Sequence, residues 1–186
     1  QPDTVLDVAT GTGDLIIALG KSSAKELIGL DISKGMLATG EEKIKAKGFQ
    51  NKILMQQGDA EAIPYADDYF DAITVAFGVR NFENLEKGLT EMNRVLKPGG
   101  LVMILETAVP TKTPFKQFYR LYSTTMLPLI GKFFSKDRSA YRYLSESASV
   151  FPYGEEFNNI LRNSGFKEVS DEPQTLGVAN IYTATK

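Results

Sequence analysis

The chain has 186 residues, of which 42% are hydrophobic and 24% are charged, a composition typical of one globular domain. Its 21 basic and 23 acidic residues give a net charge of −2, which argues against a general nucleic-acid-binding protein, because such proteins carry a basic surface. The sequence contains no cysteine and no histidine, so disulfides, thiolate chemistry and histidine bases are excluded and no metal centre is expected.

The chain alternates short apolar runs with segments of helical periodicity. In chain order, strands are predicted at 4–9, 26–30, 52–57, 70–77 and 101–106, and helices at 14–21, 33–47 and 85–96. The rest of the sequence predicts a mostly helical segment at 107–150, a helix at 154–163 and closing strands at 166–170 and 175–185. Strands that alternate with helices are typical of βαβ units and a parallel sheet.

A glycine-rich turn joins the first predicted strand to the first helix, between Asp7 and Asp14. Gly11 can take backbone angles that other residues avoid, and Gly13 lets a ligand lie against bare backbone. The dinucleotide-binding pattern requires a third glycine where this chain has Ile16, so a pyrophosphate ligand is disfavoured. The two carboxylates that bracket the turn would repel a pyrophosphate but suit a ligand that carries an ammonium and a sulfonium.

Further acidic residues follow the second and third predicted strands. Asp31 can accept hydrogen bonds from both hydroxyls of a ribose, although it can also cap a helix or lie in a solvated loop. Asp59 can accept from an adenine amino group, with the backbone N–H of Ala60 on the ring. Ile32 is placed either to pack on an adenine face or to join the core.

Five residues fall on successive predicted strand ends in chain order: Asp7, Gly11, Gly13, Asp31 and Asp59. This constellation resembles the class I S-adenosylmethionine methyltransferases, and the LKPGG turn at 96–100 matches the turn that precedes their fifth strand. The resemblance implies a Rossmann-like α/β fold with a mostly parallel seven-stranded sheet, helices on both faces and a helical lid after strand five. We therefore expect a single methyltransferase domain over 1–186, with a substrate lid at 107–150.

Longer strings narrow this resemblance. They are VLDVATGTGD at 5–14, FGVRN at 77–81, RVLKPGG at 94–100 followed by Leu105-Glu106, and YRYLSES at 141–147. They resemble the UbiE-type C-methyltransferases of menaquinone and ubiquinone biosynthesis over essentially the whole chain, and FGVRN is the most specific string, because class I enzymes in general lack it. The resemblance implies that S-adenosylmethionine is the cofactor and that a ring carbon of a polyprenylated quinol receives the methyl group.

The resemblance extends to individual residues. It implies cofactor contacts at Thr12, Asp31, Asp59 and Ala60, each of which matches the family pattern. It also puts Ala76 beside the cofactor, where some members have a serine, so a hydroxyl contact is lost in this chain. Family members carry an N-terminal helical segment before the first strand, and this chain opens directly on that strand. We therefore expect that the natural protein is longer.

Three residues near the predicted ends of strands four and five are candidates for catalysis. A quinol ring carbon becomes a better nucleophile when the neighbouring hydroxyl ionises, and free phenols titrate near pH ~10. Arg80 would stabilise the phenolate or polarise a water that acts as base, or else form a surface ion pair. Asn81 would orient a quinol oxygen or cap a helix, and Glu106 would act as a base or hold a loop by a hydrogen bond.

The sequence shows no targeting peptide and no membrane span. The most apolar long stretch, 115–134, contains three basic residues and a proline, whereas a spanning helix needs about 20 mostly apolar residues. We expect a cytoplasmic protein in which the aromatic residues of 107–150 line a channel for a prenyl tail or simply fill core. In that segment Tyr141 and Tyr143 would contact the quinol head group, on the resemblance alone. Peripheral contact with the inner face of the membrane and a homodimer are both compatible with the sequence.

Three other functions remain open. A class I methyltransferase that acts on another small molecule is disfavoured by the FGVRN string. An NAD(P)-dependent oxidoreductase is disfavoured by Ile16 and by the lack of a Tyr-x-x-x-Lys pair. A non-catalytic scaffold in a quinone-synthesis assembly is disfavoured by intact Asp31 and Asp59. The sequence leaves open whether the quinol is a naphthoquinol or a benzoquinol.

Overall fold

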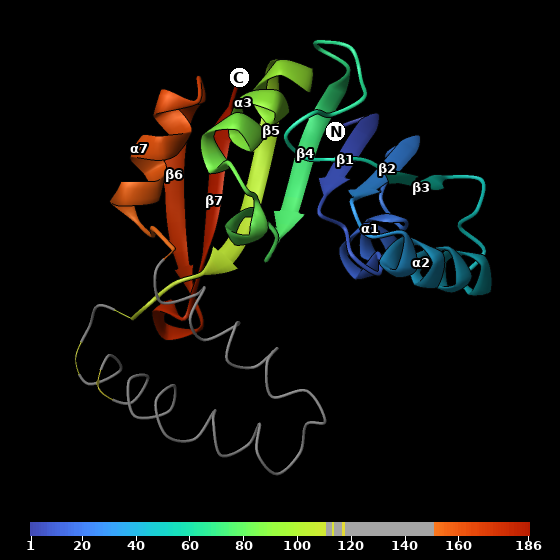
Figure 1. The fold of residues 1–186 in the computed structure, drawn as a ribbon, viewed down its shortest axis with the longest axis horizontal. Helices are drawn as coiled ribbons and strands as arrows, with labels where there is room; N and C mark the ends of the chain where they lie inside the picture. The colour runs from blue at the N-terminus through green and yellow to red at the C-terminus, as the bar shows by residue number, and fades with distance from the viewer. Residues whose placement is uncertain (111–112, 114–116, 118–150) are drawn as a thin grey trace.

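The computed structural model describes residues 1–110, 113, 117 and 151–186. Strands in this part are β1 (Thr4–Val8), β2 (Glu26–Asp31), β3 (Ile53–Gln57), β4 (Phe70–Ala76), β5 (Leu96–Thr107), β6 (Lys167–Gln174) and β7 (Ala179–Thr185). They form one seven-stranded sheet in the order β3-β2-β1-β4-β5-β7-β6 (Figure 1). Pairing is parallel except where β7 joins β5 and β6. The Rossmann-like methyltransferase fold with its mostly parallel sheet is confirmed.

Helices in the described residues are α1 (Asp14–Leu19), α2 (Lys34–Ala46), α3 (Leu85–Val95) and α7 (Glu155–Asn163), with 3-10 turns η1 (Val79–Asn81) and η3 (Thr175–Gly177). The predicted cap of α2 is present, because the side chain of Ser33 accepts a hydrogen bond from the backbone N–H of Met36. Helix α3 is capped by Asn84, whose side chain accepts from the backbone N–H of Lys87 at 3.0 Å. None of these helices is both long and apolar enough to cross a membrane.

The strands bury both faces, and each face packs against a different pair of helices. On β1 and β2, Val5 and Leu27 join a cluster with apolar residues of α1 and α2. Their chain neighbours Leu6 and Ile28 join a second cluster with residues of α3 and α7. Successive side chains of a strand point to opposite faces, so the two clusters lie on the two sides of the sheet. This explains the near-continuous apolar runs in the central strands.

Two predicted boundaries near the end of the chain were wrong. The strand expected at 175–185 begins only at Ala179, because Leu176 takes a positive φ of 61° inside the turn η3. The preceding strand β6 instead continues to Gln174 and includes Pro173. A proline lacks the N–H that a central strand needs, and it is tolerated here because β6 is an edge strand.

The predicted lid lies almost entirely outside the described residues. Only 107–110, 113 and 117 of the 107–150 segment are described. The two tyrosines expected to contact the quinol, Tyr141 and Tyr143, also fall outside the described residues.

The order of the strands determines where a ligand can bind. Strand β1 has β2 on one side and β4 on the other, so the chain changes direction across the sheet at β1. Open α/β sheets bind ligands at such a switch point, beyond the carboxyl ends of the strands. At this position the residues after β1 and β4 pack closely. A Cβ on Gly78 would lie 2.6 Å from the Cβ of Ala9, so only glycine fits.

We expect Gly78→Ala to lower the free energy of unfolding by about 1–3 kcal/mol, because its added methyl group would overlap Ala9. Adding Ala9→Gly should recover part of this loss, because it removes the opposing methyl group and also relieves a positive φ of 54° at position 9. Denaturant unfolding of both single variants and the double variant gives the coupling free energy between positions 9 and 78. Gly35→Ala on α2, where a Cβ meets nothing within 4 Å, is the control. Strictly additive single effects would contradict this explanation.

Candidate functional site

A cavity of about 570 Å³ opens at the carboxyl ends of β1, β2, β3 and β4. Four chain segments line it: Ala9 and Gly11; Leu30, Asp31, Ile32, Ser33 and Met36; Gly58, Asp59, Ala60 and Glu61; and Phe77, Gly78, Asn81, Phe82 and Glu83. The structure thus brings together six of the residues expected from the sequence, namely Gly11, Asp31, Ile32, Asp59, Ala60 and Asn81. The cavity lies at the switch point, where the fold favours ligand binding.

Asp31 connects the second strand to the glycine turn. One oxygen of its carboxylate accepts the backbone N–H of Gly11 and the other accepts the backbone N–H of Ser33, both at 2.8 Å. The turn can present its N–H in this way because Gly11 and Gly13 adopt positive φ angles of 57° and 78°. Each carboxylate oxygen can accept a second hydrogen bond. Asp31 is therefore held in place on the cavity wall with capacity left for two hydroxyl donors.

Among the described residues, the side chains that line the cavity carry net negative charge. The ionisable ones are the carboxylates of Asp31, Asp59, Glu61 and Glu83, of which Glu61 is partly neutralised by the Nζ of Lys87 at 3.9 Å. Backbone hydrogen bonds hold two of them in place: Asp59 accepts from the N–H of Glu61 at 2.9 Å, and Glu61 accepts from the N–H of Asn84 at 2.7 Å. A cleft lined by one sign of charge attracts ligands of the opposite sign. The cavity therefore favours a ligand with net positive charge.

Asp7 lies beneath the glycine turn and does not line the cavity. It is 1% exposed, and its two oxygens accept hydrogen bonds from the hydroxyls of Thr10 at 2.6 Å and Thr74 at 2.7 Å. Burial raises the pKa of Asp7 to about 6, while the two hydroxyl donors limit the rise. The side chain of Asp7, expected at the cofactor, therefore joins the glycine turn to β4.

Asp14 and Thr12, on either side of Gly13, are both bound to Lys43. The Nζ of Lys43, on α2, lies 2.8 Å from the carboxylate of Asp14 and 2.8 Å from the hydroxyl of Thr12. Neither residue lines the cavity, and Gly13 does not line it either. Because Asp14 is already paired with a lysine, it does not offer charge to a ligand. The acidic lining is instead provided by residues that follow β2, β3 and β4.

Arg80 and Glu106 form an ion pair at the ends of β4 and β5. Nη1 of Arg80 lies 2.5 Å from Oε1 of Glu106, whose side chain is fully buried, and the side chain of Arg80 is 10% exposed. The carboxylate also accepts the backbone N–H of Thr107 at 2.8 Å. Nε of Arg80 is buried and has no hydrogen-bond partner among the described residues. The expected surface ion pair is thus a buried one, with a spare donor.

Asn81 and Phe77 lie on either side of Arg80 in the FGVRN string, and both line the cavity. Asn81 does not cap α3, since Asn84 takes that position, and its Nδ2 donates to the backbone oxygen of Phe77 at 3.4 Å. Phe77 has a positive φ of 56° and is 43% exposed. Such angles are unusual for an aromatic residue and occur often at binding sites. Ala76, expected beside the cofactor, does not line the cavity.

Several cavity residues were not expected from the sequence, among them Met36, Glu61, Phe82 and Glu83. Each follows one of the strand-end motifs by only a few positions. That proximity is the one signal that would have pointed to them, and it does not distinguish a residue facing the cavity from one facing solvent. Phe77 belongs to the FGVRN string, but the string by itself predicts no role for it.

We expect the stability of the protein to depend on Asp7 between pH 4 and pH 6. The folded pKa of about 6 exceeds the ordinary value of 3.8, so the stability contribution is complete below pH ~4 and is lost as the pH rises through about 6. The Asp7→Asn side chain does not ionise, so this variant does not show the loss. The difference between its free energy of unfolding and that of wild type should therefore rise by ~3 kcal/mol between pH 4 and pH 6. Urea unfolding at a series of pH values measures it, with exposed Glu41→Gln on α2 as control. A pH-independent difference would contradict the assignment.

The comparisons with known proteins agree with this geometry. A demethylmenaquinone methyltransferase from Bacteroides fragilis is 48% identical over 187 residues, which cover 100% of this chain and 76% of that protein. A ubiquinone/menaquinone biosynthesis C-methyltransferase UbiE from Geobacter sulfurreducens is 43% identical over 184 residues, 98% of this chain and 72% of that protein.

Solved structures show the same fold. A SAM-dependent methyltransferase from Aquifex aeolicus superposes with a TM-score of 0.68 at 22% identity, over 97% of this chain and 80% of that one. The sequence matches the ubiE/COQ5 methyltransferase family over residues 1–186. The chain therefore belongs to the ubiE/COQ5 methyltransferase family.

Proposed function

We propose that this protein uses S-adenosylmethionine to methylate a ring carbon of a polyprenylated quinol, either a demethylmenaquinol or the benzoquinol precursor of ubiquinone. Membership of the family and the names of the two relatives support this reaction. The observation that supports it most directly in the structure is the cavity at the switch point, with an acidic lining and a buried arginine donor next to it in the chain.

The cavity residues fit S-adenosylmethionine. We propose that Asp31 accepts the two ribose hydroxyls with the lone pairs left after its bonds to Gly11 and Ser33. Asp59, Ala60 and the exposed Ile32 would hold the adenine, since all three line the cavity. S-adenosylmethionine carries a sulfonium, an ammonium and a carboxylate, so its net charge is positive. The acidic lining favours that charge.

Arg80 would act on the quinol. When bound, S-adenosylmethionine supplies a methyl group, whose transfer breaks its bond to sulfur, forms a bond to the ring carbon and releases the proton of that carbon. Arg80 follows the cavity residues Phe77 and Gly78 in the chain and its side chain is 10% exposed, so we propose that its positive charge stabilises the neighbouring quinol oxygen as a phenolate. A charge in a partly buried site acts more strongly than one in water, because the local dielectric is lower. Asn81, on the cavity wall, would orient the same oxygen.

We assign Glu106 to the positioning of Arg80 rather than to proton abstraction. Its carboxylate is fully buried and bound to the guanidinium of Arg80 and to the backbone N–H of Thr107. A base must reach the proton that it removes, and this side chain has no exposed surface. The pair keeps the guanidinium oriented, as a buried ion pair with good hydrogen bonds can.

A polyprenylated quinol dissolves in the membrane, which bears on how the enzyme meets it. We propose that the protein acts at the membrane surface by peripheral contact, on its cytoplasmic face. The prenyl tail would then stay partly in the bilayer while the head group enters the cavity. A flotation assay with vesicles that contain the quinol would detect this contact.

The function is tested by giving full-length protein methyl-labelled S-adenosylmethionine with demethylmenaquinol and following the label into the lipid. We expect transfer, and we expect Arg80→Met to reduce kcat by about 10²-fold, because it removes the positive charge that stabilises the developing phenolate. The Kd for S-adenosylmethionine should change by less than about twofold, because the side chain of Arg80 does not line the cavity.

The double variant Arg80→Met, Glu106→Gln serves as a control for folding, because the single variant leaves Glu106 buried and unpaired. It should be as inactive as the single variant while regaining stability. Binding of S-adenosylmethionine without transfer to demethylmenaquinol would overturn this substrate and lead to the benzoquinol. Failure on both quinols would favour another small-molecule substrate.

The acidic lining should also distinguish the cofactor from its product. S-adenosylhomocysteine lacks the sulfonium charge, and a nearby carboxylate screened by water changes the affinity for such a charge by about twofold. Glu83→Gln should therefore reduce the preference for S-adenosylmethionine over S-adenosylhomocysteine by about twofold at low salt, and by less at about 0.5 M salt. Calorimetry measures both ligands, with Glu86→Gln outside the cavity as the control. An equal effect of both variants would argue against direct charge recognition.

A further inference from the structure

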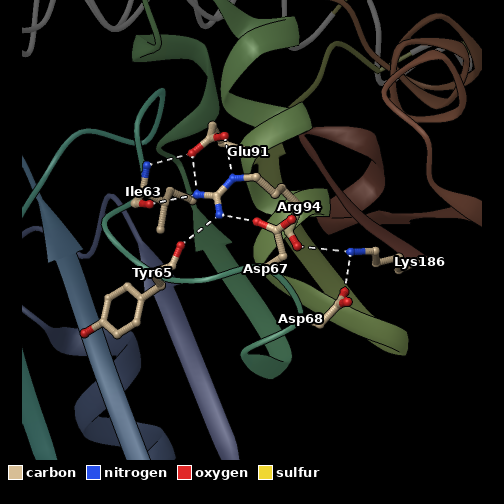
Figure 2. A network of polar contacts seen from close by, with 7 residues as sticks. All are labelled: Ile63, Tyr65, Asp67, Asp68, Glu91, Arg94 and Lys186. Carbon is tan, nitrogen blue, oxygen red and sulfur yellow. Dashed lines mark hydrogen bonds and ion pairs between the residues drawn. The ribbon is translucent and has the colours of Figure 1, made fainter.

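Arg94 lies at the C-terminal end of α3 and uses all of its side-chain donors (Figure 2). Its Nε and one N–H of Nη2 donate to the carboxylate of Glu91, both at 2.8 Å. The other N–H of Nη2 donates to the backbone oxygen of Ile63 at 2.9 Å. Its Nη1 hydrogen bonds the backbone oxygen of Tyr65 and the carboxylate of Asp67, both at 2.8 Å. All five N–H groups of the guanidinium are therefore engaged.

These acceptors belong to the long loop between β3 and β4, residues 58–69, apart from Glu91. Glu91 itself binds the loop, because its Oε2 accepts the backbone N–H of Ile63 at 3.0 Å. The hydrogen bonds to Glu91 and Asp67 raise the pKa of Arg94 above its ordinary value, so the guanidinium stays charged. Arg94 and Glu91 therefore attach the middle of this loop to α3.

The same loop begins with a wall of the cavity. Gly58, Asp59, Ala60 and Glu61 all line it, and Arg94 does not. A second attachment lies at the other end of α3, where Glu61 accepts the backbone N–H of Asn84 at 2.7 Å. Apart from the short Asp59–Ala62 bridge, this stretch has no strand pairing of its own. Its ends are held by backbone hydrogen bonds, from Gly58 to Asp31 and from Tyr69 to Val95, and the side-chain contacts to α3 hold the part in between.

We propose that Arg94 is a positioning residue for the cofactor site: by holding loop 58–69 on α3, it keeps Asp59 and Ala60 in place against the adenosine of S-adenosylmethionine. This inference rests on the proposed function, because it takes that cofactor as the occupant of the cavity. Arg94 acts through the loop and touches neither the cofactor nor the quinol.

An arginine is needed here because the acceptors lie on several sides. A guanidinium has five donors in a fixed plane, whereas a lysine ammonium has three donors around one point. A lysine at position 94 keeps the charge and can pair with Glu91 or Asp67, but it cannot also reach the backbone oxygens of Ile63 and Tyr65. The Arg94→Lys variant therefore tests the hydrogen bonds to the loop separately from the positive charge at position 94.

The test measures S-adenosylmethionine binding by calorimetry and steady-state kinetics for wild type, Arg94→Lys and Arg94→Ala, at a temperature where each is folded by circular dichroism. We expect Arg94→Lys to raise Kd and KM for S-adenosylmethionine roughly tenfold, because several charge-assisted hydrogen bonds to the loop are lost. At saturating cofactor, kcat and KM for the quinol should stay within about twofold of wild type.

The matched control is Arg162→Lys on α7, whose guanidinium also forms an ion pair along its helix, with Glu155 at 2.7 Å. It should leave Kd unchanged. Hydrogen exchange supplies a readout without ligand: the amides of Glu61, Ala62, Ile63 and Tyr65 should exchange faster in Arg94→Lys than in wild type, and those of α2 should not.

Equal Kd values for wild type and Arg94→Lys would overturn this inference while leaving the proposed function intact. A parallel loss of kcat and quinol affinity would also overturn it, because it would indicate general destabilisation. If wild type itself fails to bind S-adenosylmethionine, the proposed function fails and the inference fails with it, a result that the wild-type titration alone identifies.

Discussion

The position of β1 between β2 and β4 is the constraint on which the rest of the site depends. Because these strands and β3 run in parallel, their carboxyl ends meet at one edge of the sheet, and the residues that follow them must share the space there. The chain leaves β1 through two glycines with positive φ and leaves β4 past Gly78, which packs against Ala9. The cavity is the volume left between these turns, so its place follows from topology.

Charged groups at this edge of the sheet have two roles: some make internal contacts that stabilise the fold, and others face the cavity where a ligand can bind. Asp7 is used internally, by the hydroxyls of Thr10 and Thr74. Glu106 is likewise used internally, by Arg80. Burying a charge is costly unless hydrogen bonds or an opposite charge compensate it. Asp31 and Asp59 remain on the cavity wall, where a cationic ligand can meet them. Carboxylates of the same type therefore have different roles, because their burial and their partners differ.

Loops form most of the cavity wall, and side chains hold these loops in place. Asp31 binds backbone N–H groups on both sides of it, Glu61 binds the N-terminus of α3, and Arg94 binds loop carbonyls from the C-terminal end of that helix. Hydrogen bonds with an ionised partner are stronger than neutral ones, which suits segments without a sheet ladder. Helix α3 therefore covers the sheet and also holds loop 58–69, whose first residues line the cavity after β3.

The sequence by itself determined the parallel α/β sheet, the order of its strands and helices, and the family, because apolar periodicity and the strand-end motifs are local signals. It also pointed to Asp31, Asp59 and Asn81, since residues after parallel strands converge. Only the tertiary structure decided that Asp7 is buried, that Asp14 is neutralised by Lys43, and that Arg80 pairs with Glu106. The partners in these contacts come from different elements, so no local pattern contains them. For the same reason the turn at Leu176 and the loop held by Arg94 were visible only once the chain was folded.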